Sequence, residues 1–227
     1  MHPMPFPRAV DAVLFDFDGT LMDASAAIVG AFRAALSDQR EEIPEETIRG
    51  MIGKPLSEMF LRFRPQASPE DVASLIQSYR EAFFPLSATH THPLPGAVEA
   101  LTFLHGIVQV AVVTTRLSDG AVRMLRAHGM LESFDLVLGL EHVDHPKPDP
   151  QPVRRALRQL GVHAGRAVMI GDTPDDMKAG RGAGTGVIGV TTGAFDRPAL
   201  EAAGAHHVIA SLRELPPLLR GRVGSQS

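Results

Sequence analysis

The sequence predicts an α/β protein in which a doubly wound parallel sheet is joined to a second, smaller α-helical domain. Short apolar segments alternate with helical patterns over most of the chain, which is typical of a parallel sheet covered by helices on both faces. From about residue 22 to residue 93 this alternation stops, and helical patterns follow one another. We therefore expect a core made of residues 1–21 and 94–227 and an inserted helical domain made of residues 22–93.

Four apolar segments are expected to form strands of the sheet, and each leads into polar residues. Residues 10–15 end in Asp-Phe-Asp-Gly-Thr, and residues 107–113 end in Thr-Thr-Arg. Residues 136–140 lead towards His-Pro-Lys-Pro, and residues 167–170 end in Gly-Asp. In open parallel sheets, ligands bind outside the carboxyl ends of the strands. The sequence therefore predicts one polar crevice built from four separate segments.

Helical patterns fill the connections, and glycines just after them are typical C-terminal stops. The predicted helices of the core are residues 119–128, 151–160 and 174–183, with Gly129, Gly161 and Gly184 as their stops. The predicted helices of the inserted domain are residues 25–36, 44–51, 56–63 and 69–84, with residues 89–96 as the returning hinge. The last residues, 221–227, are expected to be disordered.

Composition limits the classes of function. The chain has 227 residues, of which 44% are hydrophobic, enough for a large core. Its net charge of −4 leaves no broad basic face for nucleic acid, so we expect a small-molecule partner. The absence of cysteine excludes disulfides and thiolate chemistry. Since no signal peptide and no run of about 18 apolar residues is found, we expect a cytoplasmic protein without membrane association. The expected oligomeric state is a monomer or a homodimer.

The first polar strand end carries two carboxylates, Asp16 and Asp18, followed by Gly19. Gly19 allows a tight turn that is expected to leave backbone N–H groups free for an anion, which is an arrangement suited to phosphate. Asp16 is the candidate nucleophile on phosphorus, because carboxylates form aspartyl-phosphate intermediates. Asp18 is the candidate that protonates the leaving alkoxide and later deprotonates the attacking water.

A phosphate dianion beside two carboxylates requires a cation. Asp172 offers a third oxygen ligand, and Mg²⁺ suits a few carboxylates together with water and substrate oxygens. Lys147 stands between two prolines, which limits where its ammonium points, and it is expected to pair with the phosphate and Asp16. Thr114 is expected to donate to a phosphate oxygen, with Thr115 and Arg116 near enough to contribute.

Taken together, the ordered motifs Asp16-Phe17-Asp18-Gly19-Thr20-Leu21, Val113-Thr114-Thr115-Arg116, Lys147-Pro148 and Gly171 to Asp176 resemble the four motifs of the haloacid dehalogenase superfamily. This resemblance covers nearly the whole chain and implies a Rossmann-like core. The helical insertion after the first motif is similar to the cap domain of the subgroup that contains phosphoglycolate phosphatases, pyrophosphatases and mutases. The resemblance thus implies a phosphoric monoester hydrolase with a helical cap.

The resemblance also implies a role for each matching residue. Asp16 becomes the nucleophile and a metal ligand, and Asp18 becomes the acid and base that also gives its backbone carbonyl to the metal. Thr114 and Lys147 become phosphate binders, and Asp172 becomes the third protein ligand. One further acid is expected to orient Lys147 or a metal-bound water. Asp176 is the preferred candidate for this role, and Asp175 is the alternative.

Several alternatives stay open at this point. Asp18 favours phosphoryl transfer over dehalogenation, and Ala24 and Ile28 stand where similar mutases carry a threonine and a histidine, which favours water as the acceptor. Inorganic pyrophosphate is an alternative substrate, and a module that binds a phosphorylated ligand without catalysis is an alternative of another class. Within the cap, Arg49 and Lys54 are the candidates for substrate specificity.

Overall fold

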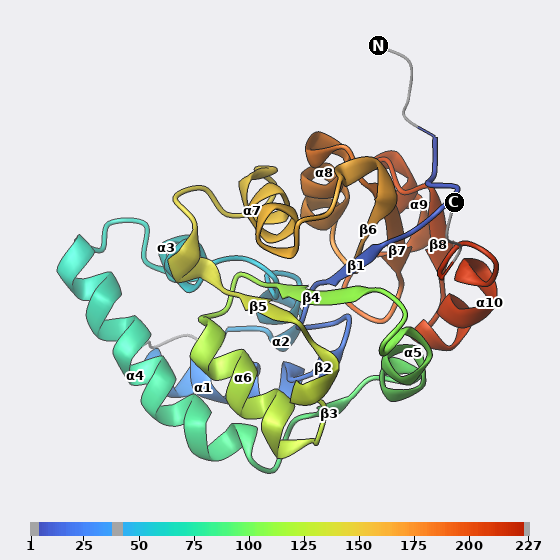
Figure 1. The fold of residues 1–227 in the computed structure, drawn as a ribbon. Coiled ribbons are helices and arrows are strands. Elements are labelled where there is room, and N and C mark those ends of the chain that lie inside the picture. Colours follow the sequence, from blue (N-terminus) through green and yellow to red (C-terminus); the bar gives the residue numbers. More distant parts are fainter. Residues whose placement is uncertain (1–4, 38–42, 225–227) are drawn as a thin grey trace.

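Six parallel strands form the central sheet, in the order β5-β4-β1-β6-β7-β8 (Figure 1). The structure is a computed structural model that describes residues 5–37 and 43–224. The six strands are β1 (Ala12–Phe15), β4 (Gln109–Val113), β5 (Leu136–Leu138), β6 (Ala167–Gly171), β7 (Gly186–Val190) and β8 (His207–Ile209). The parallel α/β core predicted from the sequence is thereby confirmed.

The winding of the sheet reverses next to β1. From β1 the chain passes to β4 and β5 on one side, and it then returns to β6, β7 and β8 on the other side. Parallel pairing places Phe15 beside Val112 and Ile170, so that these three strands end at nearly the same level. Such a reversal is where open α/β sheets bind ligands, and the polar residues after β1, β4 and β6 lie there.

Helices cover both faces of the sheet (Figure 1). Val13 and Phe15 belong to the buried cluster on the side of α5, α6 and α10, whereas Ala12 and Leu14 belong to the cluster on the side of α7, α8 and α9. This alternation follows from the two-residue period of a strand. The helices are α5 (Ala97–Leu104), α6 (Ser118–Ala127), α7 (Gln151–Leu160), α8 (Pro174–Ala183), α9 (Arg197–Ala202) and α10 (Leu215–Leu219).

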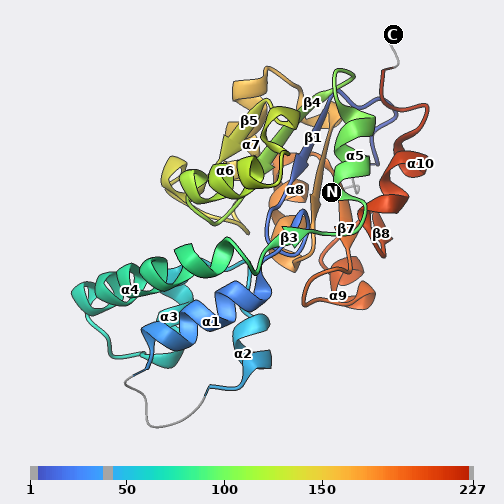
Figure 2. The same ribbon diagram turned by 90° about the horizontal axis from the view of Figure 1, so that it is seen from below.

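The inserted segment forms a helical lobe beside the sheet (Figure 2). It contains α1 (Ser25–Ala35), α2 (Glu45–Arg49), α3 (Leu56–Phe63) and α4 (Pro69–Ser87). Phe32 stacks on Phe60 with their ring centroids 4.5 Å apart, which joins α1 to α3. The chain enters and leaves the lobe through β2 (Met22–Asp23) and β3 (His92–Pro93), which pair antiparallel. No helix of the described residues is long and apolar enough to cross a membrane.

Several local predictions differ from the structure, most of them by one to three residues at the ends of elements. The strand expected over residues 136–140 stops at Leu138, because Leu140 begins a 3₁₀ helix. Helix α4 continues through Pro85 to Ser87 instead of ending at residue 84; Pro85 lies in its last turn, so the helix loses the one hydrogen bond that this nitrogen would donate and ends two residues later. Residues 221–224 are ordered, since the N–H of Val10 donates to the Arg222 carbonyl at 2.8 Å. Residues 225–227 lie outside the described residues.

Candidate active site

Lys147 joins three loops at the carboxyl edge of the sheet. Its Nζ donates to Asp16 Oδ1 at 2.7 Å, to Asp176 Oδ1 at 2.6 Å and to the carbonyl of Val113 at 3.0 Å. These contacts use all three protons of the ammonium group. The side chain is 4% exposed, and Asp16 and Asp176 outweigh the opposing effect of burial and raise the pKa of Lys147. The lysine is therefore charged and held in one position.

Three buried carboxylates gather around this lysine. Oxygen atoms of Asp16, Asp172 and Asp176 all lie within 4.8 Å of one another. Burial raises the pKa of Asp16 to about 7 against the attraction of Lys147, and burial together with the charges of Asp16 and Asp176 raises the pKa of Asp172 well above its usual range. One ammonium does not balance this negative charge, so the cluster fits a divalent cation.

The hydrogen bonds of Asp176 separate its role from those of the other two acids. Its Oδ1 accepts from Lys147, and its Oδ2 accepts from the backbone N–H and the hydroxyl of Thr173. Asp176 thus accepts three hydrogen bonds through both oxygens, while Asp16 and Asp172 have more acceptor positions left for a cation. Asp176, and not Asp175, accepts from Lys147; the Asp175 carboxylate accepts from Lys54 of the cap at 2.5 Å.

Asp18 lines a small cavity together with Asp172, and its carboxylate is paired with an arginine. Its two oxygens accept from Arg116, at 2.9 Å from Nε and 2.8 Å from Nη2, in a bidentate ion pair. The Arg116 guanidinium also lies 4.6 Å from the ring centroid of Phe83 on α4. Sequence reasoning placed Arg116 only near the phosphate, and the structure instead makes it the partner of Asp18 and a contact to the cap.

The prediction for Gly19 is corrected in one respect. Its φ of 83° provides the expected tight turn, but its N–H donates to the carbonyl of Met22 at 2.9 Å, so this group is not free for an anion. The glycine is needed for close approach, because a Cβ at this position would lie 2.4 Å from Asp172 Oδ2. The Thr20 hydroxyl donates to the other oxygen of Asp172 at 2.8 Å.

Sequence reasoning missed the loop after β7. A Cβ on Gly193 would lie 1.8 Å from Asp172 Oδ2, and the Thr192 hydroxyl donates to the Gly19 carbonyl at 2.6 Å. Both residues thus pack against the carboxylate cluster. The available signal was the apolar strand ending in Thr191-Thr192-Gly193, the same pattern that marked the other strand ends.

Three further residues predicted for the site are Thr114, Thr115 and Arg49, and each makes a different contact. The Thr114 hydroxyl is buried and accepts the N–H of Arg116 at 3.1 Å, which leaves its proton available to a ligand. The Thr115 hydroxyl instead donates to the carbonyl of Gly53 in the cap at 2.9 Å. Arg49 Nε donates to Glu45 at 2.7 Å, and Arg49 lines a cavity of about 170 Å³ together with Asp18, Gly19 and Asp172.

A parallel α/β core with a helical cap and a buried cluster of Asp16, Lys147 and Asp172 at the carboxyl edge of its sheet fit the haloacid dehalogenase type of protein. Residues 13–190 match the model of the haloacid dehalogenase-like hydrolases, and the chain belongs to this family. The resemblance noted in the sequence is therefore confirmed.

Named relatives and a solved structure agree with this assignment. The chain is 35% identical to the "Probable phosphatase IndB" of Dickeya dadantii over 89% of this chain and 90% of that protein. It is 33% identical to the pyrophosphatase PpaX of Bacillus velezensis, over 81% of this chain and 84% of that protein. It is 30% identical to the phosphoglycolate phosphatase of Caulobacter vibrioides, over 90% of this chain and 88% of that protein. A haloacid dehalogenase-like hydrolase from Bacteroides fragilis superimposes with a TM-score of 0.86 at 29% identity, covering 91% of this chain and 99% of that chain.

Proposed function

We propose that this protein is a Mg²⁺-dependent phosphatase that hydrolyses small phosphorylated metabolites, phosphoglycolate among them, through a phosphoryl group carried on Asp16. The observation that carries the proposal is the buried cluster in which Lys147 holds Asp16 at 2.7 Å while Asp172 lies within 4.8 Å. Relatives named phosphatase support the same class of reaction. Asp16 and Asp172, with the Asp18 carbonyl, are the proposed ligands, and Mg²⁺ supplies positive charge for the phosphate oxygens when it is bound.

Two displacements at phosphorus make up the proposed reaction. A carboxylate oxygen of Asp16 attacks the phosphorus, the bond to the leaving oxygen breaks, and that oxygen takes the proton of the Asp18 carboxyl group. Water then gives a proton to Asp18 and attacks the same phosphorus, which breaks the bond to Asp16 and releases phosphate. Lys147 keeps Asp16 in position and neutralises charge on the transferred group, and Thr114 donates to one of its oxygens.

Asp18 is well placed for both proton transfers. It lines the small cavity next to Asp172 and also a larger cavity that extends under the cap. We therefore propose that Asp18 gives its proton to a leaving group on the cap side and takes one from water that enters through either cavity. Its bond to Arg116 has to loosen at one oxygen for the transfer, and we propose that substrate entry causes this change.

Pyrophosphate is the second candidate substrate, because the relative from Bacillus velezensis is named a pyrophosphatase. A sugar-phosphate mutase is disfavoured, since Ala24 and Ile28 are buried apolar residues that cannot relay a proton. Binding without catalysis is disfavoured because the proposed nucleophile and the lysine are both present and in contact.

Hydrolysis of p-nitrophenyl phosphate, with Mg²⁺ and with excess EDTA, tests the proposal. We expect turnover that requires the metal and that disappears in the Asp16→Asn variant, which controls for contaminating phosphatases. Phosphoglycolate and pyrophosphate are then compared by kcat/KM. Turnover that is absent with every divalent metal, or equal in the variant, contradicts the proposed function.

A further inference from the structure

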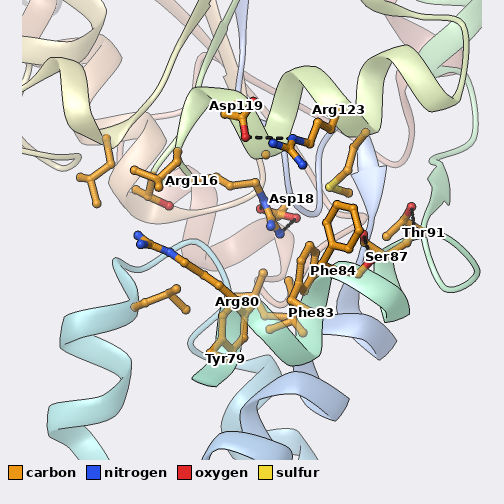
Figure 3. Close-up of a pocket in the computed structure, with 18 of the residues that line it drawn as sticks. Asp18, Tyr79, Arg80, Phe83, Phe84, Ser87, Thr91, Arg116, Asp119 and Arg123 are labelled. Atoms are coloured by element: carbon orange, nitrogen blue, oxygen red, sulfur yellow. Dashed lines mark hydrogen bonds and ion pairs between the residues drawn. The ribbon is translucent and has the colours of Figure 1, made fainter. Parts of the chain in front are cut away.

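A cavity of about 960 Å³ lies between α4 of the cap and the start of α6 in the core (Figure 3). Asp18 and Arg116 line it, and Asp18 also lines the smaller cavity that contains Asp172. Cavities that enclose ligands of drug size have volumes of roughly 300–1,000 Å³. This cavity is therefore at the upper end of that range, and the two-carbon acid of phosphoglycolate would fill only a small part of it.

The cap side of the cavity is largely aromatic and apolar. Tyr79, Phe83 and Phe84 of α4 line it, and Figure 3 shows the two phenylalanines facing Arg116 and Arg123. Phe84 is 63% exposed although it is a large apolar residue. A phenyl ring left exposed at the wall of a cavity is suited to contact a ligand. The core side contributes Met124, whose thioether packs well against aromatic rings.

Four arginines, whose guanidinium groups are planar cations, also line the cavity. Arg116 and Arg123 are paired with Asp18 and Asp119, and the Arg123 guanidinium lies 5.6 Å from the ring centroid of Phe84. Arg80 and Arg126 also line the cavity, with no carboxylate partner among the described residues. Guanidinium groups and phenyl rings both stack on flat ring systems, whereas neither selects a short aliphatic chain.

We propose that the preferred substrate is a phosphomonoester whose leaving group carries a planar ring system, of the size of a nucleoside, and that this ring lies between α4 and α6. The proposal rests on the proposed function, since it assigns the substrate class of the same site. The phosphoryl group lies at Asp16, the leaving oxygen lies at Asp18, and the ring extends from there along Phe84.

The test compares adenosine 5′-monophosphate and uridine 5′-monophosphate with methyl ribofuranoside 5-phosphate. All three release a primary alkoxide of ribose, so their ratio of kcat/KM isolates the contribution of the ring. We expect kcat/KM for at least one nucleotide to exceed that for the ribofuranoside phosphate by about tenfold or more, because a base that stacks on an aromatic side chain contributes that much to binding. Phe84→Ala should lower this ratio by about tenfold. Leu61→Ala, an exposed apolar residue of the cap outside the cavity, is the matched control and should leave the ratio unchanged.

The outcomes separate the two proposals. A wild-type ratio near one, a ratio that Phe84→Ala does not change, or a higher kcat/KM for phosphoglycolate than for both nucleotides overturns this inference while leaving the phosphatase intact. If no phosphomonoester is hydrolysed, p-nitrophenyl phosphate included, the proposed function fails and the substrate class fails with it.

Discussion

Two lysines show how differently the two parts of the site are built. The Lys147 side chain is 4% exposed and contacts two carboxylates and a carbonyl, all within the core. The Lys54 side chain is 36% exposed and pairs with Asp175 across the boundary between cap and core. Groups held like Lys147 are costly to separate from their partners, whereas a partly exposed contact like that of Lys54 breaks at little cost. We therefore propose that the buried cluster sets the chemistry and that the cap side sets substrate choice and access.

The largest effect is expected at the nucleophile. Asp16→Asn should lower kcat by at least about 10³-fold, since removal of a nucleophile in covalent catalysis is among the most costly changes. Binding of inorganic phosphate, measured by calorimetry with Mg²⁺ present, should persist because Lys147 and Thr114 remain. A variant with activity within about tenfold of the wild type would remove Asp16 from the nucleophile's position.

Asp18 should show an effect that depends on the leaving group. Asp18→Asn should lower kcat by roughly 10²–10⁴-fold with an alkyl phosphate, because the leaving alkoxide needs a proton. The loss should be smaller with p-nitrophenyl phosphate, whose phenolate leaves without one. Equal losses with both substrates would instead point to a structural role through the ion pair with Arg116.

The buried lysine should matter for stability as well. Lys147→Met leaves two buried carboxylates without their partner, so the free energy of unfolding should fall by about 3–5 kcal/mol. Urea unfolding at pH 8 without metal measures this change. A loss below about 1 kcal/mol, the range of surface pairs, would contradict the view that this cluster is buried and rigid.

The carboxylate cluster also predicts how stability depends on pH. The pKa of Asp16 is raised from 3.8 to about 7 and that of Asp172 is raised too, chiefly by burial, so the folded protein binds these protons more tightly than the unfolded chain. Without metal, the contribution of Asp16 to the free energy of unfolding is therefore greatest below about pH 4 and is lost as the pH rises through about 7, and the contribution of Asp172 falls with rising pH in the same direction. Urea unfolding in EDTA should show this decrease less steeply for Asp16→Asn than for the wild type, and Mg²⁺ should restore stability at pH 8. If the free energy of unfolding fell with pH equally steeply for the wild type and for Asp16→Asn, the raised pKa of Asp16 would be contradicted.

The smallest effect is expected at the cap. Lys54→Met should change the free energy of unfolding by less than about 1 kcal/mol, because the lysine side chain that pairs with Asp175 is 36% exposed. The same urea titration that is used for Lys147→Met provides the comparison. A cost similar to that of Lys147→Met would show that the boundary between cap and core is as rigid as the buried cluster.

Much of the fold could be predicted from local signals. The helices over residues 151–160 and 174–183 have the predicted bounds, because Gly161 and Gly184 stop them in the left-handed conformation. Asp16, Lys147 and Asp172 could be placed near one another because each follows a strand or a stiff turn at the same edge of a parallel sheet.

The remaining features depend on contacts that local patterns do not encode. Asp18 and Arg116 are 98 residues apart, and no spacing rule pairs them. Asp175 and Asp176 are both in the first turn of α8, where only the orientation of the helix against the sheet decides which one meets Lys147. The order of residues 221–224 depends on their pairing with Val10 at the opposite end of the chain.

The phosphoryl group on Asp16 can be detected directly. The enzyme is mixed with Mg²⁺ and p-nitrophenyl phosphate, quenched in acid within milliseconds and reduced with borohydride, which converts an aspartyl-phosphate to homoserine. Peptide mass spectrometry should then find homoserine at position 16, only when substrate was present and not in Asp16→Asn. Homoserine at another aspartate, or at none while the enzyme turns over, would contradict nucleophilic attack by Asp16.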